Sequence, residues 1–115
     1  MLVESGVTWL PPLMWRLDKN WKGLRREVPW VDRLPSEVIR DAFRLTAQPL
    51  DGPDDPAAVV RVLERLGSDR MLLFSTDYPH HQFDDPAQAA PPLPPDALAR
   101  FLGGNAVDTY RLEAR

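Results

Sequence analysis

The sequence predicts an α/β fold with parallel strands, and two features of the chain carry this prediction. Short apolar runs alternate with longer segments in which apolar residues recur at spacings of three and four, the period of a helix. The apolar run at residues 71–74 ends abruptly in Ser75, Thr76 and Asp77, as a buried parallel strand does when it presents polar side chains at its carboxyl end. Alternating strands and helices connect by right-handed crossovers and form a parallel sheet.

The first part of the chain is predicted to hold a strand end and two helices. Residues 2–4 form a short apolar start before a Ser-Gly turn, which fits the last piece of a strand. A Pro-Pro pair at residues 11–12 opens a helix that is expected over residues 13–26. The apolar stripe of this helix consists of Met14, Leu17, Trp21 and Leu24. A shorter helix is expected over residues 35–42.

The middle of the chain is predicted to form a strand, a helix and a second strand. The first strand covers residues 43–47 and stops before a Gln-Pro pair. The helix starts with Asp55 as its N-cap and Pro56 at its first position, and it ends at Gly67, a natural C-terminal stop. Its apolar face consists of Val59, Val62, Leu63 and Leu66. The second strand is the run at residues 71–74.

Two short helices are predicted near the C-terminal end. The first starts at Pro95 and runs through Leu102. Gly103 and Gly104 are expected to break it, and Asn105 is expected to cap a last helix.

A length of 115 residues suits one domain, and a hydrophobic fraction of 43% makes a packed core possible. Three parallel strands leave both edges of their sheet unpaired. Residues 1–115 are therefore expected to be the last part of a larger unit. A barrel of alternating strands and helices typically runs to about 250 residues.

Composition argues against several classes of function. A net charge of −3 argues against a general nucleic-acid binder, which is normally basic. The absence of cysteine excludes a disulfide framework and a thiolate metal site. No apolar run approaches the roughly 20 residues that span a bilayer, and no signal-peptide pattern occurs. We therefore expect no membrane association and a cytoplasmic location.

The tryptophans and a basic cluster admit two interpretations. Trp9, Trp15, Trp21 and Trp30 would suit a stacking platform for bases or sugars. The helical spacing of Trp21 with Leu17 and Leu24 favours a place in the core or a helix interface instead. The basic residues between positions 16 and 26 fit a solvated helix face better than a phosphate site, given the negative total charge.

Asp77 is the leading candidate for a functional residue. Ligands in parallel-sheet folds bind at the carboxyl ends of the strands, and Asp77 follows the strand predicted at residues 71–74. The alternative is a loop aspartate that hydrogen-bonds its own backbone. His80 and His81 follow in a polar loop, where solvated histidines are usual.

Four stretches of the sequence carry a resemblance to a known family. They are Glu4-Ser5-Gly6 with Trp9-Leu10-Pro11, Trp15-Arg16-Leu17-Asp18 with Trp21, Phe74 to His80, and Gly104-Asn105-Ala106 with Tyr110. The chain resembles the C-terminal part of the amidohydrolase-related metal-dependent hydrolases, in the branch that includes aminocarboxymuconate semialdehyde decarboxylase. The Ser-Thr-Asp-Tyr-Pro-His run is the most specific piece, and the resemblance covers nearly the whole chain.

The resemblance implies the C-terminal portion of a TIM-like (β/α)8 barrel, to which this chain would contribute about three strand-helix units. It implies a divalent metal, usually zinc, which lowers the pKa of bound water toward about 7 and polarises a carbonyl. The expected activity is hydrolysis of a small organic substrate, with non-oxidative decarboxylation as the alternative. Asp77 matches the family's last-strand aspartate, which would ligate the metal or accept a proton from metal-bound water.

Three further residues receive expected roles at the mouth of the site. Glu4 stands where decarboxylase relatives tend to carry a histidine followed by glycines, so it is expected to act as an acid or base, although the relatives' exact role does not carry over. Its alternatives are to cap a neighbouring helix or to face solvent. His80 and Trp9 are expected to contact the substrate.

The chain lacks the other metal ligands of the family. It has no His-x-His pair, and His80 and His81 are its two histidines. Because a catalytic zinc takes about three protein ligands, the 115-residue chain alone is expected to be inactive. It would work with a complementary N-terminal half or as a homo-oligomer. The competing hypothesis is a non-catalytic remnant or partner subunit that completes a barrel.

Overall fold

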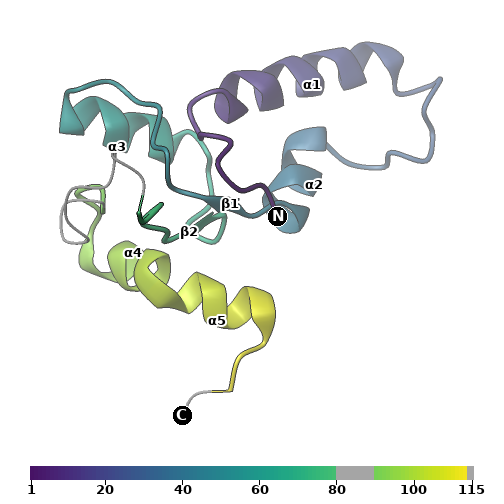
Figure 1. The fold of residues 1–115 in the computed structure, drawn as a ribbon. Helices are drawn as coiled ribbons and strands as arrows, with labels where there is room; N and C mark the ends of the chain where they lie inside the picture. Colours follow the sequence, from purple (N-terminus) through teal and green to yellow (C-terminus); the bar gives the residue numbers. More distant parts are fainter. Residues whose placement is uncertain (80–89, 114–115) are drawn as a thin grey trace.

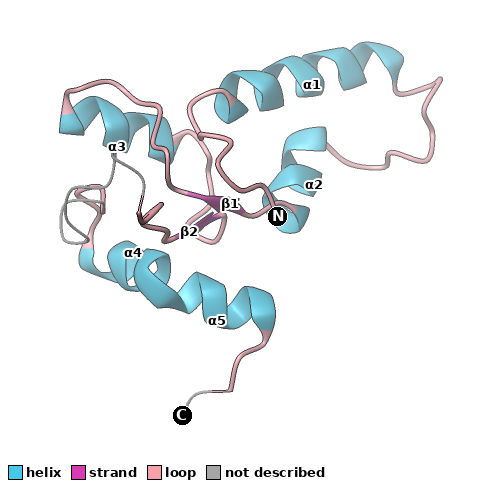
Figure 2. Cartoon of the chain, viewed as in Figure 1, coloured by secondary structure: helices cyan, strands magenta, loops and turns pink. Residues whose placement is uncertain are grey.

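The computed structural model describes residues 1–79 and 90–113 (Figure 1). Helices surround a small central sheet, as the colouring by secondary structure shows (Figure 2). The elements are, in chain order, α1 (Leu10–Leu24), α2 (Pro35–Ala42), β1 (Leu45–Thr46), α3 (Pro56–Glu64), β2 (Leu72–Leu73), α4 (Pro95–Ala99), the π-helical turn η1 (Arg100–Gly104) and α5 (Asn105–Tyr110). Strands and helices alternate as predicted.

The sheet is parallel in the described residues. β1 pairs with β2 in the register Leu45 to Leu72 and Thr46 to Leu73. Leu2 adds an isolated parallel bridge to Leu45 on the other side of β1, where the Leu2 amide donates to the Arg44 carbonyl at 2.8 Å. The described sheet therefore has two short strands and one bridge, instead of the three full strands that the sequence predicts.

The core lies between the sheet and the helices that pack against it. Leu45 and Leu72 are register partners and so share one face of the sheet. Both belong to the cluster of buried apolar residues, which also takes members from α1, α2, α3 and η1. The other buried members of the cluster are Val7, Leu10, Met14, Ile39, Ala47, Val59, Leu63, Leu66, Met71 and Phe101. The apolar residues that recur at helical spacing in the sequence therefore cover one face of the sheet.

Helix α1 packs against α2. It starts three residues earlier than predicted, so the Pro-Pro pair lies in its first turn, where proline is tolerated. Leu24 is 48% exposed, so the prediction that it belongs to a buried stripe is wrong. The end of α1 extends beyond α2, where no other element covers it (Figure 1). Trp21 is half-buried as expected, and its indole donates to the Val31 carbonyl at 3.0 Å.

Polar contacts fix α2 to its neighbours. The Ser36 amide donates to the Asp18 carboxylate of α1 at 2.9 Å. Arg40 donates through Nε to the Leu66 carbonyl at 2.7 Å, which ties α2 to the end of α3. The hydrogen bond to Asp41 raises the pKa of the Arg33 guanidinium, but both side chains are exposed and such pairs contribute little to stability.

Helix α3 starts where predicted, but it ends at Glu64, three residues before the predicted stop at Gly67. The Asp55 side chain accepts a hydrogen bond from the Ala57 amide at 3.0 Å, which confirms Asp55 as the N-cap. Gly67 follows the helix with a φ of +67°, a conformation that glycine adopts without a steric penalty. These signals depend on residues within a few positions of the helix end, so the sequence alone is sufficient to find them.

The prediction that Gly103 and Gly104 break the C-terminal helix is wrong. The turn η1 joins α4 directly to α5, and the Asn105 amide donates to the Arg100 carbonyl in a π-helical bond. Asn105 is 2% exposed and does not cap a helix. Its side-chain amide donates instead to the carbonyls of Asp69 at 2.7 Å and Leu72 at 2.8 Å, and the buried Leu72 carbonyl needs such a partner.

No helix in residues 1–79 or 90–113 is long and apolar enough to cross a lipid bilayer.

Candidate functional site

The carboxyl ends of the paired segments open toward one edge of the sheet, because the pairings are all parallel. Polar residues follow each segment within a few positions. We use the term strand-end site for Glu4, Thr46, Gln48, Ser75 and Asp77. Since parallel-sheet folds bind ligands at this edge, the strand-end site is where the chain is expected to meet a substrate.

A chain of side-chain to backbone hydrogen bonds links the three strand ends. The Glu4 amide donates to Thr46 Oγ1 at 3.2 Å, and that hydroxyl donates to the Gln48 carbonyl at 3.4 Å. The Gln48 amide then donates to Ser75 Oγ at 3.1 Å. These contacts bring Glu4 and the segment that carries Asp77 to the same edge, as the sequence predicts.

The two predicted acidic residues share an uncommon backbone conformation. Glu4 has a φ of 53° and Asp77 a φ of 57°, in the left-handed region. A residue other than glycine in this region costs of order 1–3 kcal/mol, and such residues cluster at functional sites. The strain is therefore a second reason, independent of strand topology, to regard these two positions as functional candidates.

The carboxylates of Glu4 and Asp77 make no hydrogen bond or ion pair in the described part of the chain. Asp77 is half-buried and Glu4 is exposed. The Tyr78 amide is bonded to Thr76 Oγ1 at 3.3 Å. The alternative in which Asp77 hydrogen-bonds its own backbone is thus not observed among the residues that the structure describes.

The two residues expected to contact substrate have different outcomes. Trp9 is 39% exposed at the start of α1, and its indole donates to the Ser5 carbonyl at 2.7 Å, in the turn after the Leu2 segment. It therefore lies next to the turn that follows Glu4, and its substrate contact stays a prediction. His80 and His81 lie outside the described residues.

Asp51 is a third acidic residue near this edge that the sequence analysis missed. It follows β1, and its carboxylate lies against Gly6, where an added Cβ would come within 2.5 Å of Oδ2. Gly6 has a φ of +65°, so the turn after Glu4 needs glycine for its conformation as well as for space. The sequence signal that would have identified Asp51 is its position shortly after a predicted strand.

The model of the family described as amidohydrolase matches residues 1–112. The chain belongs to the amidohydrolase family. This result confirms the resemblance found in the sequence, and it agrees with acidic residues at the carboxyl ends of parallel strands. A comparison with curated proteins gave no significant match.

Solved structures with the same fold include two amidohydrolase-family decarboxylases. The chain is 29% identical to 5-carboxyvanillate decarboxylase LigW from Sphingomonas paucimobilis, with a TM-score of 0.66 over 94% of this chain and 33% of that one. For 2,6-dihydroxybenzoate decarboxylase in complex with 2,6-dihydroxybenzoate, the identity is 21% and the TM-score 0.58 over 93% and 33%, which supports the fold alone. The chain thus spans about a third of each enzyme.

Amidohydrolase-family decarboxylases are generally metal-dependent, so we asked whether the side chains of this chain could hold a metal ion. A catalytic zinc takes about three protein ligands. Among residues 1–79 and 90–113, no three His, Cys, Asp or Glu side chains come close enough to hold a metal ion. The described residues therefore do not fit a complete metal site.

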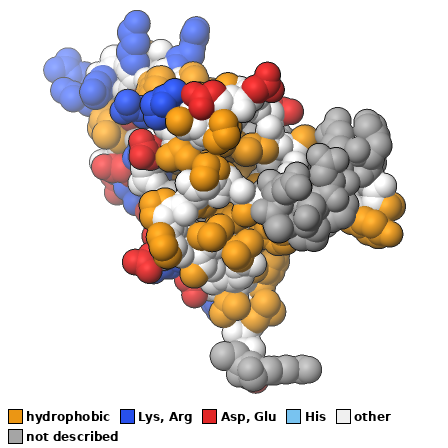
Figure 3. All heavy atoms as spheres, turned by 90° about the vertical axis from the view of Figure 1, so that its left-hand side faces the viewer, with side chains coloured by type: hydrophobic (Ala, Val, Ile, Leu, Met, Phe, Trp, Pro, Cys, Tyr) orange, Lys and Arg blue, Asp and Glu red, His pale blue; other side chains and the backbone are white. Residues whose placement is uncertain are grey.

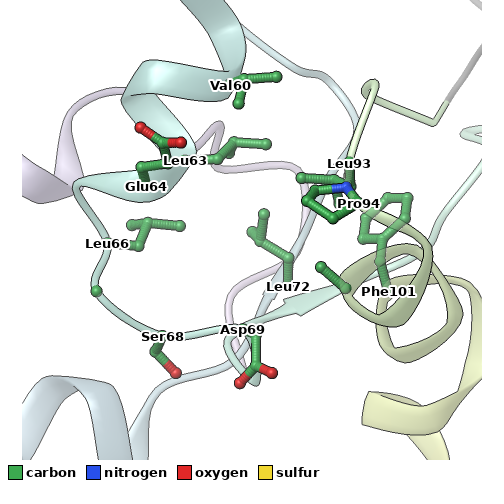
Figure 4. A pocket seen from close by; sticks show the side chains of 12 residues that line it. Val60, Leu63, Glu64, Leu66, Ser68, Asp69, Leu72, Leu93, Pro94 and Phe101 are labelled. Atoms are coloured by element: carbon green, nitrogen blue, oxygen red, sulfur yellow. The ribbon is translucent and has the colours of Figure 1, made fainter.

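An apolar cavity of about 360 Å³ lies on the helical side of the sheet (Figure 4). Val60 and Leu63 of α3 face Leu93 and Phe101 across it, and Leu72 of β2 points into it (Figure 4). Apolar side chains also gather over the surface that carries α3 and α4 (Figure 3). None of Glu4, Trp9 and Asp77 lines this cavity, so it is separate from the strand-end site.

Proposed function

We propose that this chain supplies the C-terminal third of an amidohydrolase-type barrel, with Asp77 as the carboxylate that ends its last strand. The observation that carries the proposal is the pair of acidic residues, Glu4 and Asp77, with left-handed backbone at the carboxyl ends of parallel segments. The family match over residues 1–112 and the 33% coverage of both decarboxylases support it.

The proposed reaction is the non-oxidative decarboxylation of a small organic acid. The 29% identity to 5-carboxyvanillate decarboxylase favours this reaction. Decarboxylation breaks the bond to the carboxylate carbon, releases CO2 and requires a proton on the carbon that remains. We assign this proton to the Glu4 carboxyl, because a side chain at the site edge can hold a proton within reach of the substrate. Asp77 would supply one oxygen ligand to a divalent metal.

Hydrolysis of a small organic substrate is the second candidate, favoured by the amidohydrolase family match itself. In that case a water molecule is added across the scissile bond, and the half-buried Asp77 carboxylate would accept a proton from the water. Either reaction needs metal ligands beyond those in residues 1–79 and 90–113. We propose that a complementary N-terminal segment, or a second copy of the chain, supplies them.

The first test is to read the coding DNA directly upstream of Met1. We expect a continuous or neighbouring reading frame that encodes a His-x-His strand, as the family resemblance implies. If neither exists, the chain is better explained as a remnant that retains Asp77 without a complete site.

The second test uses the complete polypeptide or the reconstituted pair of chains. Metal content and CO2 release from a panel of small aromatic carboxylic acids are measured for the wild type and for Asp77→Asn. We expect Asp77→Asn to hold less than one equivalent of metal and to lower CO2 release by more than about a hundredfold, since loss of even a supporting residue costs about 10–100-fold in metal affinity or activity. Asp54→Asn, in the exposed loop after β1, is the matched control. Full activity of Asp77→Asn would contradict the proposal.

A further inference from the structure

The strand-end site contains two hydroxyl side chains to which the proposed function assigns no role. The last backbone bond of the β1–β2 ladder runs from the Ala47 amide to the Leu73 carbonyl at 3.0 Å. Beyond it, the hydroxyls of Thr46 and Ser75 connect the strand ends. Side-chain hydrogen bonds therefore continue the sheet over the residues that carry the candidate acids.

Thr46 is the centre of this arrangement. Its hydroxyl accepts the Glu4 amide at 3.2 Å and donates to the Gln48 carbonyl at 3.4 Å, so it uses both its donor and an acceptor site. Thr46 is 9% exposed, and water competes little for bonds in such a place. Glu4 needs such a constraint, because its left-handed φ persists only where the surroundings fix it.

Ser75 lies two residues after the end of β2. Its Oγ accepts the Gln48 amide at 3.1 Å, and it precedes Asp77 by two residues. The Gln48 backbone is therefore bonded on both sides, to Thr46 through its carbonyl and to Ser75 through its amide. Since Asp77 also has a left-handed φ, the anchoring of Ser75 restricts the segment from which the Asp77 carboxylate projects.

We propose that Thr46 and Ser75 are positioning residues that set the relative placement of Glu4 and Asp77. The inference rests on the proposed function for its purpose, since these are the two carboxylates that the reaction needs. Neither hydroxyl has to touch the substrate. Each acts through the backbone of a neighbouring strand, so the relative placement of the acids depends on a hydroxyl at both positions.

NMR spectroscopy of the 115-residue chain tests this with a matched pair of variants at Thr46. Thr46→Val keeps the shape of the side chain and removes the hydroxyl, whereas Thr46→Ser keeps the hydroxyl. We expect Thr46→Val to speed hydrogen exchange of the Glu4 amide by about tenfold, as loss of one buried hydrogen bond does. It should also shift the carboxyl ¹³C signal of Glu4, and Thr46→Ser should restore both readouts.

Ser75→Ala provides a second, independent test. It should speed exchange of the Gln48 amide and shift the carboxyl ¹³C signal of Asp77. Ser68→Ala is the matched control. It also removes a serine hydroxyl that accepts a backbone amide, that of Arg70 at 3.2 Å, but this bond lies in the turn before β2. It should leave the Asp77 signal unchanged.

Two results would overturn the positioning role. One is unchanged Glu4 and Asp77 signals in Thr46→Val and Ser75→Ala. The other is equal acceleration at the Leu45 amide, which bonds Met71 in the core ladder, because that would report general destabilisation. These readouts need neither metal nor turnover, so the positioning role can fail while the role of Asp77 holds, and the reverse.

Discussion

The side chain of Asn105 donates a hydrogen bond to the carbonyl of Leu72 at 2.8 Å and thereby ties the C-terminal helix to the edge of β2. The same amide bonds the Asp69 carbonyl at 2.7 Å, in the turn before the strand. Phe101 adds its carbonyl, which accepts the Phe74 amide at 3.1 Å. The strand whose end carries Asp77 is therefore held on one side by β1 and on the other by side-chain and backbone groups of η1 and α5.

Removing this amide should destabilise the fold strongly. Asn105→Ala removes both bonds of a buried side chain and leaves the buried Leu72 carbonyl without its donor, so we expect a loss of about 2–3 kcal/mol in the free energy of unfolding. Urea unfolding monitored by circular dichroism measures it. Asp108→Asn, in the same helix with an exposed side chain, is the control and should change stability by less than about 0.5 kcal/mol. A similar loss in both variants would exclude a specific role for Asn105.

Two glycines should respond to alanine in opposite directions. Gly6→Ala places a Cβ within 2.5 Å of Asp51 Oδ2 at a φ of +65°, so we expect a loss of about 1–2 kcal/mol. Gly23→Ala, in helix α1 with no atom within 4 Å of the new Cβ, should gain about 0.5–1 kcal/mol. Thermal unfolding of both proteins compares them. Adding Asp51→Ala should recover part of the Gly6→Ala loss, and no recovery would argue against the contact.

The N-cap of α3 should account for a smaller part of stability. Asp55→Ala removes the bond from the Ala57 amide at 3.0 Å, for an expected cost of about 1 kcal/mol. The exposed ion pair of Asp55 with Arg61 should add little. Asp55→Asn keeps a capping side chain and should restore most of the loss in urea unfolding. If Asp55→Asn is as unstable as Asp55→Ala, the ion pair rather than the cap is responsible.

Filling the cavity between α3 and α4 should stabilise the chain. Ala97 lines this space of about 360 Å³, so Ala97→Leu buries more apolar surface there, and we expect a gain of about 1 kcal/mol. Ala99→Leu, at an exposed position of the same helix, is the control and should have little effect. Thermal unfolding distinguishes the two. A loss of stability in Ala97→Leu would show that the cavity walls are too rigid to accept the larger side chain.

The isolated chain should neither bind zinc tightly nor turn over substrate. A catalytic zinc takes about three protein ligands, and no such group occurs among the residues that the structure describes. Metal analysis of the purified 115-residue chain should give well below one equivalent after dialysis against a weak chelator. One tightly held equivalent, together with activity, would show that the site is complete without a partner.

Local signals in the sequence were sufficient for much of the fold. The alternation of apolar runs and helical periodicity predicted the parallel α/β arrangement, and Asp55 marked the start of α3. The position of Asp77 three residues after an apolar run predicted that it follows the carboxyl end of a strand, and β2 ends at Leu73. These features depend on residues a few positions apart, and the physics of a strand, a cap or a helix stop is local.

The tertiary structure determined the features that depend on contacts between residues distant in the sequence. Gly103 and Gly104 continue the helix, and the buried amide of Asn105 bonds the carbonyls of Asp69 and Leu72, which are 36 and 33 residues away in the sequence. In the same way, the hydroxyl of Thr46 meets the amide of Glu4 across 42 residues, and Asp51 packs against Gly6. A buried polar group takes the partner that packing brings to it, and sequence spacing does not reveal that partner.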